Sequence, residues 1–445
     1  MGIQYLYKWI STFHKHSIEQ TFQSYYHNLC IDITGLIHYA TQYVYRYGKF
    51  KQYPKLFLKE NESYSLVIYT IQRMIQTFIR LSNPSKRIIF VMDGVSPGTK
   101  RLTQRTRRFS NKKVSQFNIN QISVGTIFID RISNDIYEYL LTLVPSTELQ
   151  IYFSDYRTPG ESEYKIIQYI QDHIELQERI LIISRDSDII LLSLSLLHSN
   201  LYILRYNEYH TTNIINIHTL KQTISDELPI DDFYLLTVLS MTNDYNLAIP
   251  FSSFTISKLI MAYKHYYTMY SLPIIKINRI CTYSFYLFIQ LLYFSNNTTI
   301  YNENEYEQML KSFHWGWDYF GNKRINSWIW ANPYPSMSFS MYFLSKYLDK
   351  YNDFFERITW SPSIPNTPFE QLIQILPLID SNLLPIHLRL FIINNNINQI
   401  PMYDKEYYEF LCSSLSLKDR LRNFHIYPLQ MDKRSLKNRC FFLKK

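Results

Sequence analysis

Two pairs of acidic residues lie close together in one apolar stretch of this chain. Glu161 and Glu163 follow a Pro-Gly break and open a segment in which isoleucines recur with helical spacing. Asp186 and Asp188 follow a short β-branched apolar run that predicts a buried strand. The stretch therefore predicts a βαβ unit that presents four carboxylates at the carboxyl end of a sheet, where open α/β folds place their sites.

Four carboxylates at short range repel one another and raise one another's pKa unless cations neutralise them. Hard oxygen ligands suit Mg²⁺ or Mn²⁺, and two such ions about 4 Å apart are a known device for cleaving phosphodiester bonds. Either acid pair alone fits an ordinary solvated helix or strand end, since acids are common at helix starts. Both pairs in one βαβ unit, flanked by apolar strands, favour a site for divalent cations.

Three further acids occupy comparable positions. Asp32 lies in an apolar strand, where burial is costly unless the carboxylate binds something, and a hydrogen-bonded structural role is an equal alternative. Asp93 ends a second apolar strand just before a glycine turn. Asp244 ends an apolar helix and by itself would be an ordinary helix-end residue. His38, six residues after Asp32, by itself fits a packing or surface histidine.

A strongly basic segment, KRLTQRTRRFSNKK, follows Asp93, and no acid occurs between Asp93 and Asp130. On a helix, four of its side chains share one face at positions i, i+4, i+7 and i+8: Lys100, Gln104, Arg107 and Arg108. Such a cluster suits a phosphate, to which arginine offers planar forks. A solvated basic helix is the alternative for a charge run, but the position directly after a strand-end carboxylate favours phosphate binding.

The composition indicates a globular chain with a polyanionic partner. Its 445 residues suffice for two or three domains, and its hydrophobic content of 46% argues against disorder. The formal net charge of +9 favours a polyanion without identifying it. The four cysteines lie far apart, without metal or redox spacing, which predicts reduced thiols in a cytosol or nucleus. We expect neither a signal peptide nor a membrane span.

The character of the chain changes near residue 251. Before it, acid-tipped strands alternate with helical segments; after it, long apolar-aromatic helical stretches alternate with Asn- and Pro-rich breaks. We therefore expect an α/β domain with a doubly wound, mainly parallel sheet over residues 1–250, and a mostly helical second region over residues 251–445. The second region holds four tryptophans within sixteen residues, more often a core cluster than a base-stacking platform: Trp315, Trp317, Trp328 and Trp330.

In their order along the chain, these segments resemble the Xrn-type 5′→3′ exoribonucleases of the PIN/flap-nuclease superfamily. The similar segments are MGIQYLYKWI, IDITGLIH, FVMDGVSPGTKRLTQRTRRF, TPGESEYKIIQYI, ISRDSDIILL and MTNDYNLAIP, with SWIWANPYPS as a later patch. The chain departs from the family pattern at Ser162 and Tyr164, where the family has Gly and His, and at Asn246-Leu247-Ala248. It resembles a compact form that lacks the large C-terminal domains.

The resemblance implies an N-terminal nuclease domain whose pocket the second region completes. It implies a hydrolase that degrades 5′-monophosphorylated single-stranded RNA processively to mononucleotides, with two ions of Mg²⁺ or Mn²⁺. The catalytic, metal-binding acids that it implies are Asp32, Asp93, Glu161, Glu163, Asp186, Asp188 and Asp244. It assigns the 5′-phosphate to Lys100, Gln104, Arg107 and Arg108. It assigns base stacking to His38 and Trp328, with Trp330 or Trp315 as alternatives to the tryptophan.

Two other interpretations stay open. A structure-specific 5′ flap DNA nuclease is disfavoured by the tight phosphate pocket, because flap cutters must thread or clamp a junction. A catalytically inactive RNA-binding scaffold is disfavoured because all seven acids are present. The expected partner is single-stranded RNA with a 5′-monophosphate, without a membrane, and decapping or RNA-decay proteins are further candidates. The expected compartment is the cytoplasm, with the nucleus as the alternative.

Overall fold

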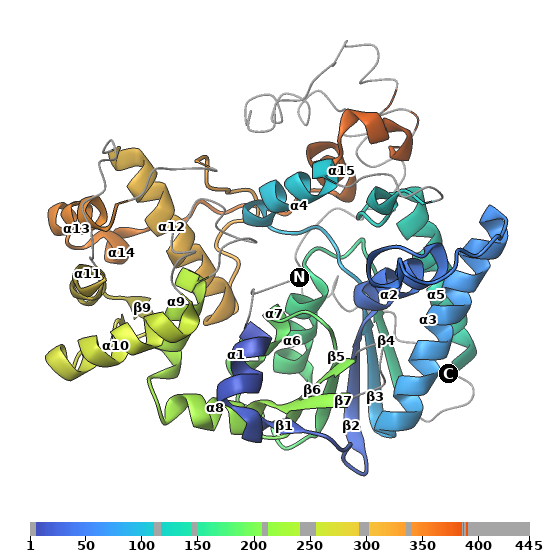
Figure 1. Cartoon of the computed structure of the whole chain (residues 1–445), viewed down its shortest axis with the longest axis horizontal. Helices are drawn as coiled ribbons and strands as arrows, with labels where there is room; N and C mark the ends of the chain where they lie inside the picture. Colours follow the sequence, from blue (N-terminus) through green and yellow to red (C-terminus); the bar gives the residue numbers. More distant parts are fainter. Residues whose placement is uncertain are drawn as a thin grey trace.

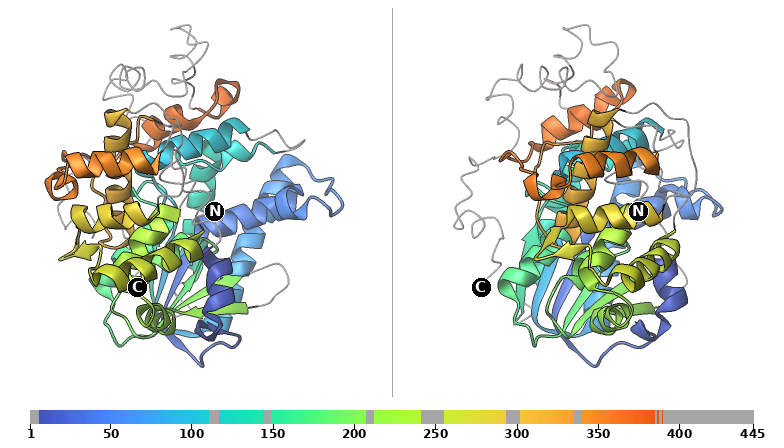
Figure 2. Two further views of the ribbon diagram at one scale, coloured as in Figure 1. Left: turned by 60° about the vertical axis from the view of Figure 1, so that its left-hand side comes forward. Right: turned by 90° about the vertical axis from the view of Figure 1, so that its left-hand side faces the viewer.

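The computed structural model describes residues 6–110, 117–143, 149–206, 212–240, 255–292, 302–334 and 340–384, together with Ile386 and Arg389. Within these residues, helices cover both faces of a seven-stranded sheet (Figure 1). Further helices, α10 to α14, gather to one side of that sheet, and the turned views show the same arrangement (Figure 2). The predicted α/β class, with a helix-rich second part, is confirmed.

The sheet has the strand order β1-β7-β6-β5-β2-β3-β4. Its parallel strands are β2 (Tyr26–Asp32), β3 (Pro84–Val91), β4 (Gln150–Ser154), β5 (Ile180–Ile183) and β6 (Leu201–Tyr206). Two antiparallel strands extend it beyond β6: β7 (Thr212–Asn216) and β1 (Ile18–Glu19). The chain runs from β2 outward to β4 and returns to β5 on the other side of β2. This reversal is the point at which doubly wound sheets place ligands, outside the carboxyl ends of the strands.

Two hydrophobic clusters lie on opposite faces of the sheet, because alternate strand residues point to opposite sides. Cys30 belongs to one cluster, whereas its neighbours Leu29 and Ile31 belong to the other. The helices that pack in the cluster of Cys30 are α1 (Leu6–Phe13), α6 (Ser162–His173), α7 (Asp188–Leu194) and α8 (Ile217–Ser225). Those in the cluster of Leu29 are α2 (Ile33–Tyr45), α3 (Glu60–Ser82) and α5 (Ile127–Leu143).

The helices that follow α8 extend the hydrophobic cluster of Cys30, which includes Phe285 and Trp315. They are α9 (Ile230–Ser240), α10 (Ile256–Tyr270), α11 (Thr282–Leu291), α12 (Glu303–Phe320), α13 (Met341–Lys350) and α14 (Phe354–Arg357), with a hairpin of β8 (Ile275–Lys276) and β9 (Arg279–Ile280). Helix α15 (Pro368–Ile375) instead packs in the cluster of Leu29. The expected boundary at residue 250 lies outside the described residues and stays a prediction.

In the part of the chain that the structure describes, no helix combines the length and apolarity needed to cross a membrane. Cys30 and Cys281 are both free thiols.

A buried carboxylate fixes the start of β5, the strand that leads to Asp186. Glu178 is only 2% exposed and accepts hydrogen bonds from Asn28 at 2.6 Å and from Lys86 at 2.6 Å. Arg87 adds an ion pair to the same carboxylate at 2.8 Å. These contacts join β2, β3 and β5 at the amino end of the sheet, opposite the strand-end acids.

We predict that Glu178→Ala lowers the free energy of unfolding by about 1.5–3 kcal/mol, because the buried donors around it lose a charged acceptor. Urea denaturation measures this change. Glu175→Ala, which removes an exposed carboxylate three residues away, is the matched control and should stay within about 0.5 kcal/mol of the parent. Equal stabilities of the two variants would contradict the structural role of Glu178.

Candidate active site

Acidic side chains from neighbouring strand ends meet at the carboxyl edge of the sheet. The six described acids are Asp32 at the end of β2, Asp93 just after β3, Glu161 and Glu163 at the start of α6, Asp186 between β5 and α7, and Asp188 at the first position of α7. This placement follows from the parallel strands, whose carboxyl ends share one edge. Asp244 lies outside the described residues.

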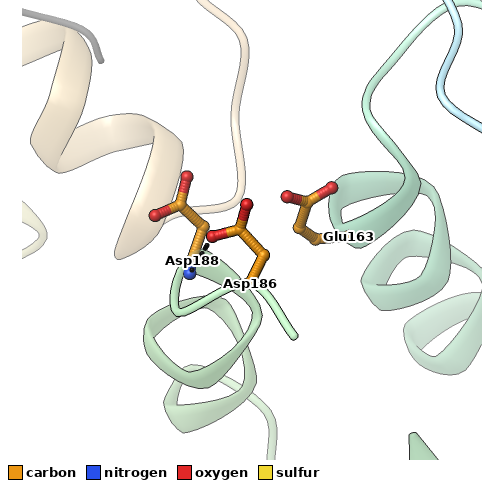
Figure 3. Close-up of side chains that lie close together, drawn as sticks. All are labelled: Glu163, Asp186 and Asp188. Carbon is orange, nitrogen blue, oxygen red and sulfur yellow. Dashed lines mark hydrogen bonds between the residues drawn. The ribbon is translucent and has the colours of Figure 1, made fainter. Parts of the chain in front are cut away.

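Three of these acids form a tight group: Glu163, Asp186 and Asp188. Each offers a carboxylate oxygen, and these oxygens all lie within 4.8 Å of one another. Figure 3 shows their side chains turned toward a shared space between α6 and α7. The backbone N–H of Asp188 donates to Oδ1 of Asp186 at 3.2 Å, which fixes the turn between the two aspartates. This group can hold a metal ion, since carboxylate oxygens are the ligands that hard divalent cations prefer.

Two serines connect the acids of different segments. The hydroxyl of Ser184 donates to Oδ2 of Asp32 at 3.2 Å and accepts from the backbone N–H of Asp186 at 3.2 Å. The backbone N–H of Ser162 donates to Oδ1 of Asp93 at 2.8 Å. Its hydroxyl donates to Oε2 of Glu163 at 3.0 Å. Ser162, a departure from the family pattern, thus adds a hydrogen-bond donor among the carboxylates.

A direct backbone contact brings Asp93 to the start of α6. The N–H of Gly94 donates to the carbonyl of Gly160 at 2.8 Å, and the N–H of Gly160 donates to the carbonyl of Val95 at 2.8 Å. A Cβ on Gly94 would lie 1.8 Å from the carbonyl oxygen of Thr158, and Gly160 has a φ of +103°. Both glycines are therefore required for the two turns to meet.

The electrostatics of the group favour a bound cation. Burial raises the pKa of Asp32 to about 7, and the nearby charge of Asp93 adds to this effect. Burial also raises the pKa of Glu163 well above its usual range, as do the charges of Asp186 and Asp93. Lys100 opposes this shift in Glu163, but its single charge balances only one of the six carboxylates. Divalent cations would relieve the remaining repulsion.

The predicted basic helix forms α4 (Gly98–Ser110), and its first basic residue, Lys100, contacts the acids at the sheet edge. Nζ of Lys100 lies 2.7 Å from Oε1 of Glu161 and 3.6 Å from Oδ2 of Asp188. The lysine is only 5% exposed, so it is committed to these acids in the structure. The phosphate assignment of this residue stays a prediction.

The other predicted phosphate residues lie farther along α4. Arg107 and Gln104 are half-buried on the same helix as Lys100. Arg108 donates from Nε to the hydroxyl of Ser123 at 2.7 Å and from Nη1 to the carbonyl of Gln104 at 3.0 Å. Burial and the charge of Arg107 lower the pKa of Arg108 to about 10, and the charge of Asp93 opposes this change. An anion beside this helix would therefore be met by a guanidinium that burial has already partly desolvated.

The aromatic segment after α12 touches the first turn of α4. The N–H of Gly98 donates to the carbonyl of Trp328 at 2.8 Å. A Cβ on Gly98 would lie 2.5 Å from the carbonyl oxygen of Ile329, so glycine is required for this approach. The N–H of Trp328 in turn donates to the hydroxyl oxygen of Ser363 at 2.8 Å. Trp328 is thus fixed through its backbone beside the basic helix.

Helix α15 supports α4 from the other side, and the two helices lie side by side (Figure 1). The side-chain oxygen of Gln371 accepts from the backbone N–H of Ser96 at 2.8 Å. Nη1 of Arg105 donates to the carbonyl of Gln374 at 2.8 Å. Arg105, one of the seven basic residues of the segment, therefore holds α4 to α15 rather than facing an anion.

The candidates for base stacking differ in exposure. Trp315 is fully buried and stacks on Tyr319 with ring centroids 5.1 Å apart, which agrees with a core role. Trp330 is half-buried and packs its ring edge-on against Trp360 at 5.1 Å. Trp328 and His38 are also half-buried. The assignment of stacking to Trp328 and His38 stays a prediction.

His38, in α2, is close enough to the charged residues at the carboxyl edge of the sheet for them to shift its pKa. Burial lowers its pKa to about 4, and the charges of Arg108 and Arg185 add to this effect, whereas Asp93 opposes it. The imidazole is therefore neutral near pH 7.

Sequence reasoning missed several supporting residues. The hydroxyl of Tyr319 donates to Oε2 of Glu161 at 3.4 Å, and its ring also stacks on Tyr164 at 5.4 Å. Tyr319 comes from α12, and nothing in the sequence signals a contact across 158 positions. Ser184, by contrast, stands two positions before Asp186 on the same strand exit, so its spacing offered a signal.

The sequence of this region matches a known family. Residues 1–116 and 110–207 match the sequence profile of the XRN 5′-3′ exonuclease N-terminus. Over these residues the chain is similar to the XRN exonuclease N-terminus. The predicted resemblance is thereby confirmed, and the matched XRN region contains the six described acids and helix α4.

Curated relatives are named as 5′-3′ exoribonucleases or exonucleases. The chain is 27% identical to 5′-3′ exoribonuclease 1 of Schizosaccharomyces pombe over 274 residues, which cover 55% of this chain and 19% of the relative. It is 25% identical to 5′-3′ exoribonuclease 1 of Homo sapiens over 242 residues, covering 46% of this chain and 13% of the relative. A putative 5′-3′ exonuclease of Acanthamoeba polyphaga mimivirus is 30% identical over 117 residues, which cover 24% of this chain and 19% of the relative. The chain therefore matches less than a fifth of the length of each of these three relatives.

We predict that Asp186→Asn removes metal-dependent stabilisation without destabilising the metal-free protein. The amide keeps an acceptor for the N–H of Asp188 but removes one charge from the repulsive group. A divalent ion at a hundredfold excess over its Kd should stabilise the parent by about 2.7 kcal/mol. Thermal unfolding in EDTA and in Mg²⁺ or Mn²⁺ measures both effects.

The matched control is Asp172→Asn, which changes an exposed aspartate near the end of α6. It should keep the full metal-dependent rise in Tm. An unchanged rise in Asp186→Asn would show that the acidic group is not the metal site.

Proposed function

We propose that this chain is a 5′→3′ exoribonuclease that degrades 5′-monophosphorylated single-stranded RNA processively to mononucleotides. The observation that carries the proposal is the direct contact of the acidic group with the basic helix, through Lys100, in a chain similar to the XRN exonucleases. A metal site for phosphodiester hydrolysis and a cationic helix for a terminal phosphate adjoin each other. This arrangement suits a nuclease that binds the 5′ end of a strand and cleaves at a fixed distance from it.

In this proposal, two Mg²⁺ or Mn²⁺ ions supply the hydroxide and stabilise the leaving oxygen. Glu163, Asp186 and Asp188 have the carboxylate spacing to share one ion. Asp32 and Asp93, joined to that group through Ser184 and Ser162, supply ligands alongside them. Glu161 and Asp244 complete the proposed set.

The terminal phosphate is held by residues of α4: Lys100, Gln104, Arg107 and Arg108. Holding the 5′ end there sets the first linkage over the carboxylates, so that chemistry begins from an oriented strand. Trp328 and His38 stack on the first base, which stabilises the strand between successive cuts. The backbone bond from Gly98 to Trp328 supports this proposal, because it ties the aromatic segment to the phosphate helix.

We further propose that the protein acts on RNA in the cytoplasm, with the nucleus as the alternative compartment. Decapping and RNA-decay proteins are candidate partners, because decapping generates 5′-monophosphate ends.

The decisive experiment is a time course on the same RNA with a 5′-phosphate, a 5′-hydroxyl or a cap, with Mg²⁺ or EDTA. We expect mononucleotides from 5′-phosphate RNA with Mg²⁺ and none with EDTA. Asp188→Ala should lose hydrolysis and keep RNA binding, because it removes a metal ligand rather than the cationic helix. Efficient internal cutting of circular RNA, or faster cutting of flapped DNA, would overturn the proposal.

Arg107→Ala should lower kcat/KM on 5′-phosphate RNA by about tenfold or more. The ratio of kcat/KM on 5′-phosphate RNA to that on 5′-hydroxyl RNA should fall as well. A charge-assisted hydrogen bond to the phosphate is worth about 1.5–3 kcal/mol, and a 5′-hydroxyl does not make it. The charge-matched control is Arg131→Ala, which changes an arginine on α5 whose guanidinium carbon lies 3.8 Å from the centroid of the Tyr64 ring on α3. An equal loss on both substrates would mean that Arg107 serves only as a general electrostatic contact.

A further inference from the structure

We propose that Arg185 binds the RNA phosphate that follows the bond to be cut, so that cations hold the strand on both sides of the carboxylates. This inference rests on the proposed function, because it assumes that a strand passes over the acidic group from a 5′ end at α4. Arg185 lies outside the basic helix α4, so this phosphate contact is separate from the proposed 5′-phosphate site.

Arg185 stands directly before Asp186, in the turn between β5 and α7. Its guanidinium carbon lies 5.3 Å from the centroid of the Tyr206 ring, at the end of β6. Tyr206 itself packs against Phe78 at 5.3 Å and Tyr39 at 6.3 Å between ring centroids. The ring is therefore held by its neighbours and positions the guanidinium at the carboxyl edge of the sheet.

The two groups of cations flank the acids along the sheet. Helix α4 follows β3, whereas Arg185 leans over β6, and the order β6-β5-β2-β3 separates them. The aspartates at the ends of β5 and β2 lie between these positions. A strand that begins at α4 and is cut at the acids therefore continues toward Arg185 on its 3′ side.

Among the described residues, Arg185 makes no ion pair, although Asp186 follows it directly in the chain, and its guanidinium lies over the Tyr206 ring instead. Neighbouring arginines are engaged: Arg205 donates to the carbonyl of Asp186 at 2.8 Å, and Arg108 donates to Ser123. The charge of Arg185 also acts on His38, whose pKa it helps to lower. The charge of Arg185 therefore acts on His38, the residue proposed to stack on the first base of the RNA strand.

A guanidinium that stacks on a tyrosine keeps its N–H edge available for an anion. Phosphate accepts two parallel hydrogen bonds from that edge, and such charge-assisted bonds are strong. A half-buried arginine on a fixed ring loses little side-chain freedom when it makes them. Of the groups on an RNA strand, the phosphate is the one that fits both the charge and the fork.

The test measures binding of 5′-phosphorylated RNA by fluorescence anisotropy at several salt concentrations in EDTA, where no hydrolysis occurs. We expect Arg185→Gln to weaken binding about tenfold or more and to lower the slope of log K against log salt by about 0.7. The matched control is Arg179→Gln, at the opposite end of β5, whose guanidinium stacks 4.9 Å from the centroid of the Tyr25 ring. It should keep the parent affinity and slope.

A second arm locates the phosphate on the strand. RNA with one neutral methylphosphonate at the second internucleotide linkage should bind the parent protein about tenfold more weakly than RNA that is neutral at a distal linkage. Arg185→Gln should bind these two RNAs equally. If Arg185→Gln does not fold by circular dichroism, equal binding of both RNAs by the parent overturns the inference.

An unchanged affinity and salt slope in folded Arg185→Gln would also overturn it. Because this test needs no cutting, it separates the two proposals. A parent protein that binds RNA but never hydrolyses it in Mg²⁺ would overturn the proposed exonuclease function, while the slope would still decide the role of Arg185.

Discussion

Mutual repulsion among buried carboxylates is the constraint on which this structure depends. Asp32 and Glu163 both have raised pKa values because burial and like charges oppose their ionised forms. Groups that repel in this way stay together only when the surrounding backbone determines their positions. The glycine turns at Gly94 and Gly160 and the bridging serines meet that requirement, and Lys100 offsets part of the charge. The acids are thus held together by backbone and serine hydrogen bonds, carry an excess of negative charge that favours a bound cation, and already contact the helix proposed to bind the substrate.

Much of the fold and part of the site could be predicted from the sequence. The run before Asp186 and the isoleucine spacing after Glu163 have strong periodicities, and both elements form as β5 and α6. Parallel strand ends necessarily share an edge, so the convergence of the acids followed from the βαβ pattern. The basic helix formed as expected because its residues favour helix and no proline interrupts them.

The support of that helix could not be predicted, because it depends on contacts between distant segments. Gln371 and Tyr319 meet the site through tertiary packing, and neither belongs to a motif that local patterning could identify. Lys100 contacts the acids, but helical spacing alone does not predict which residue of one helix face makes that contact. Local chemistry therefore indicated which residues matter, whereas packing decided which neighbour each of them touches.

The contact between Ser96 and Gln371 joins residues 275 positions apart, and it has a consequence for the order in which the protein is made. Domains fold from the N-terminus during synthesis at roughly 5–20 residues per second, so the sheet and its acids emerge from the ribosome on the order of tens of seconds before α15. During that interval α4 lacks its support from Gln371 and Gln374. The acidic part of the nascent chain therefore precedes the segment that supports α4, and a ribosome that stalls before residue 371 leaves α4 without that support.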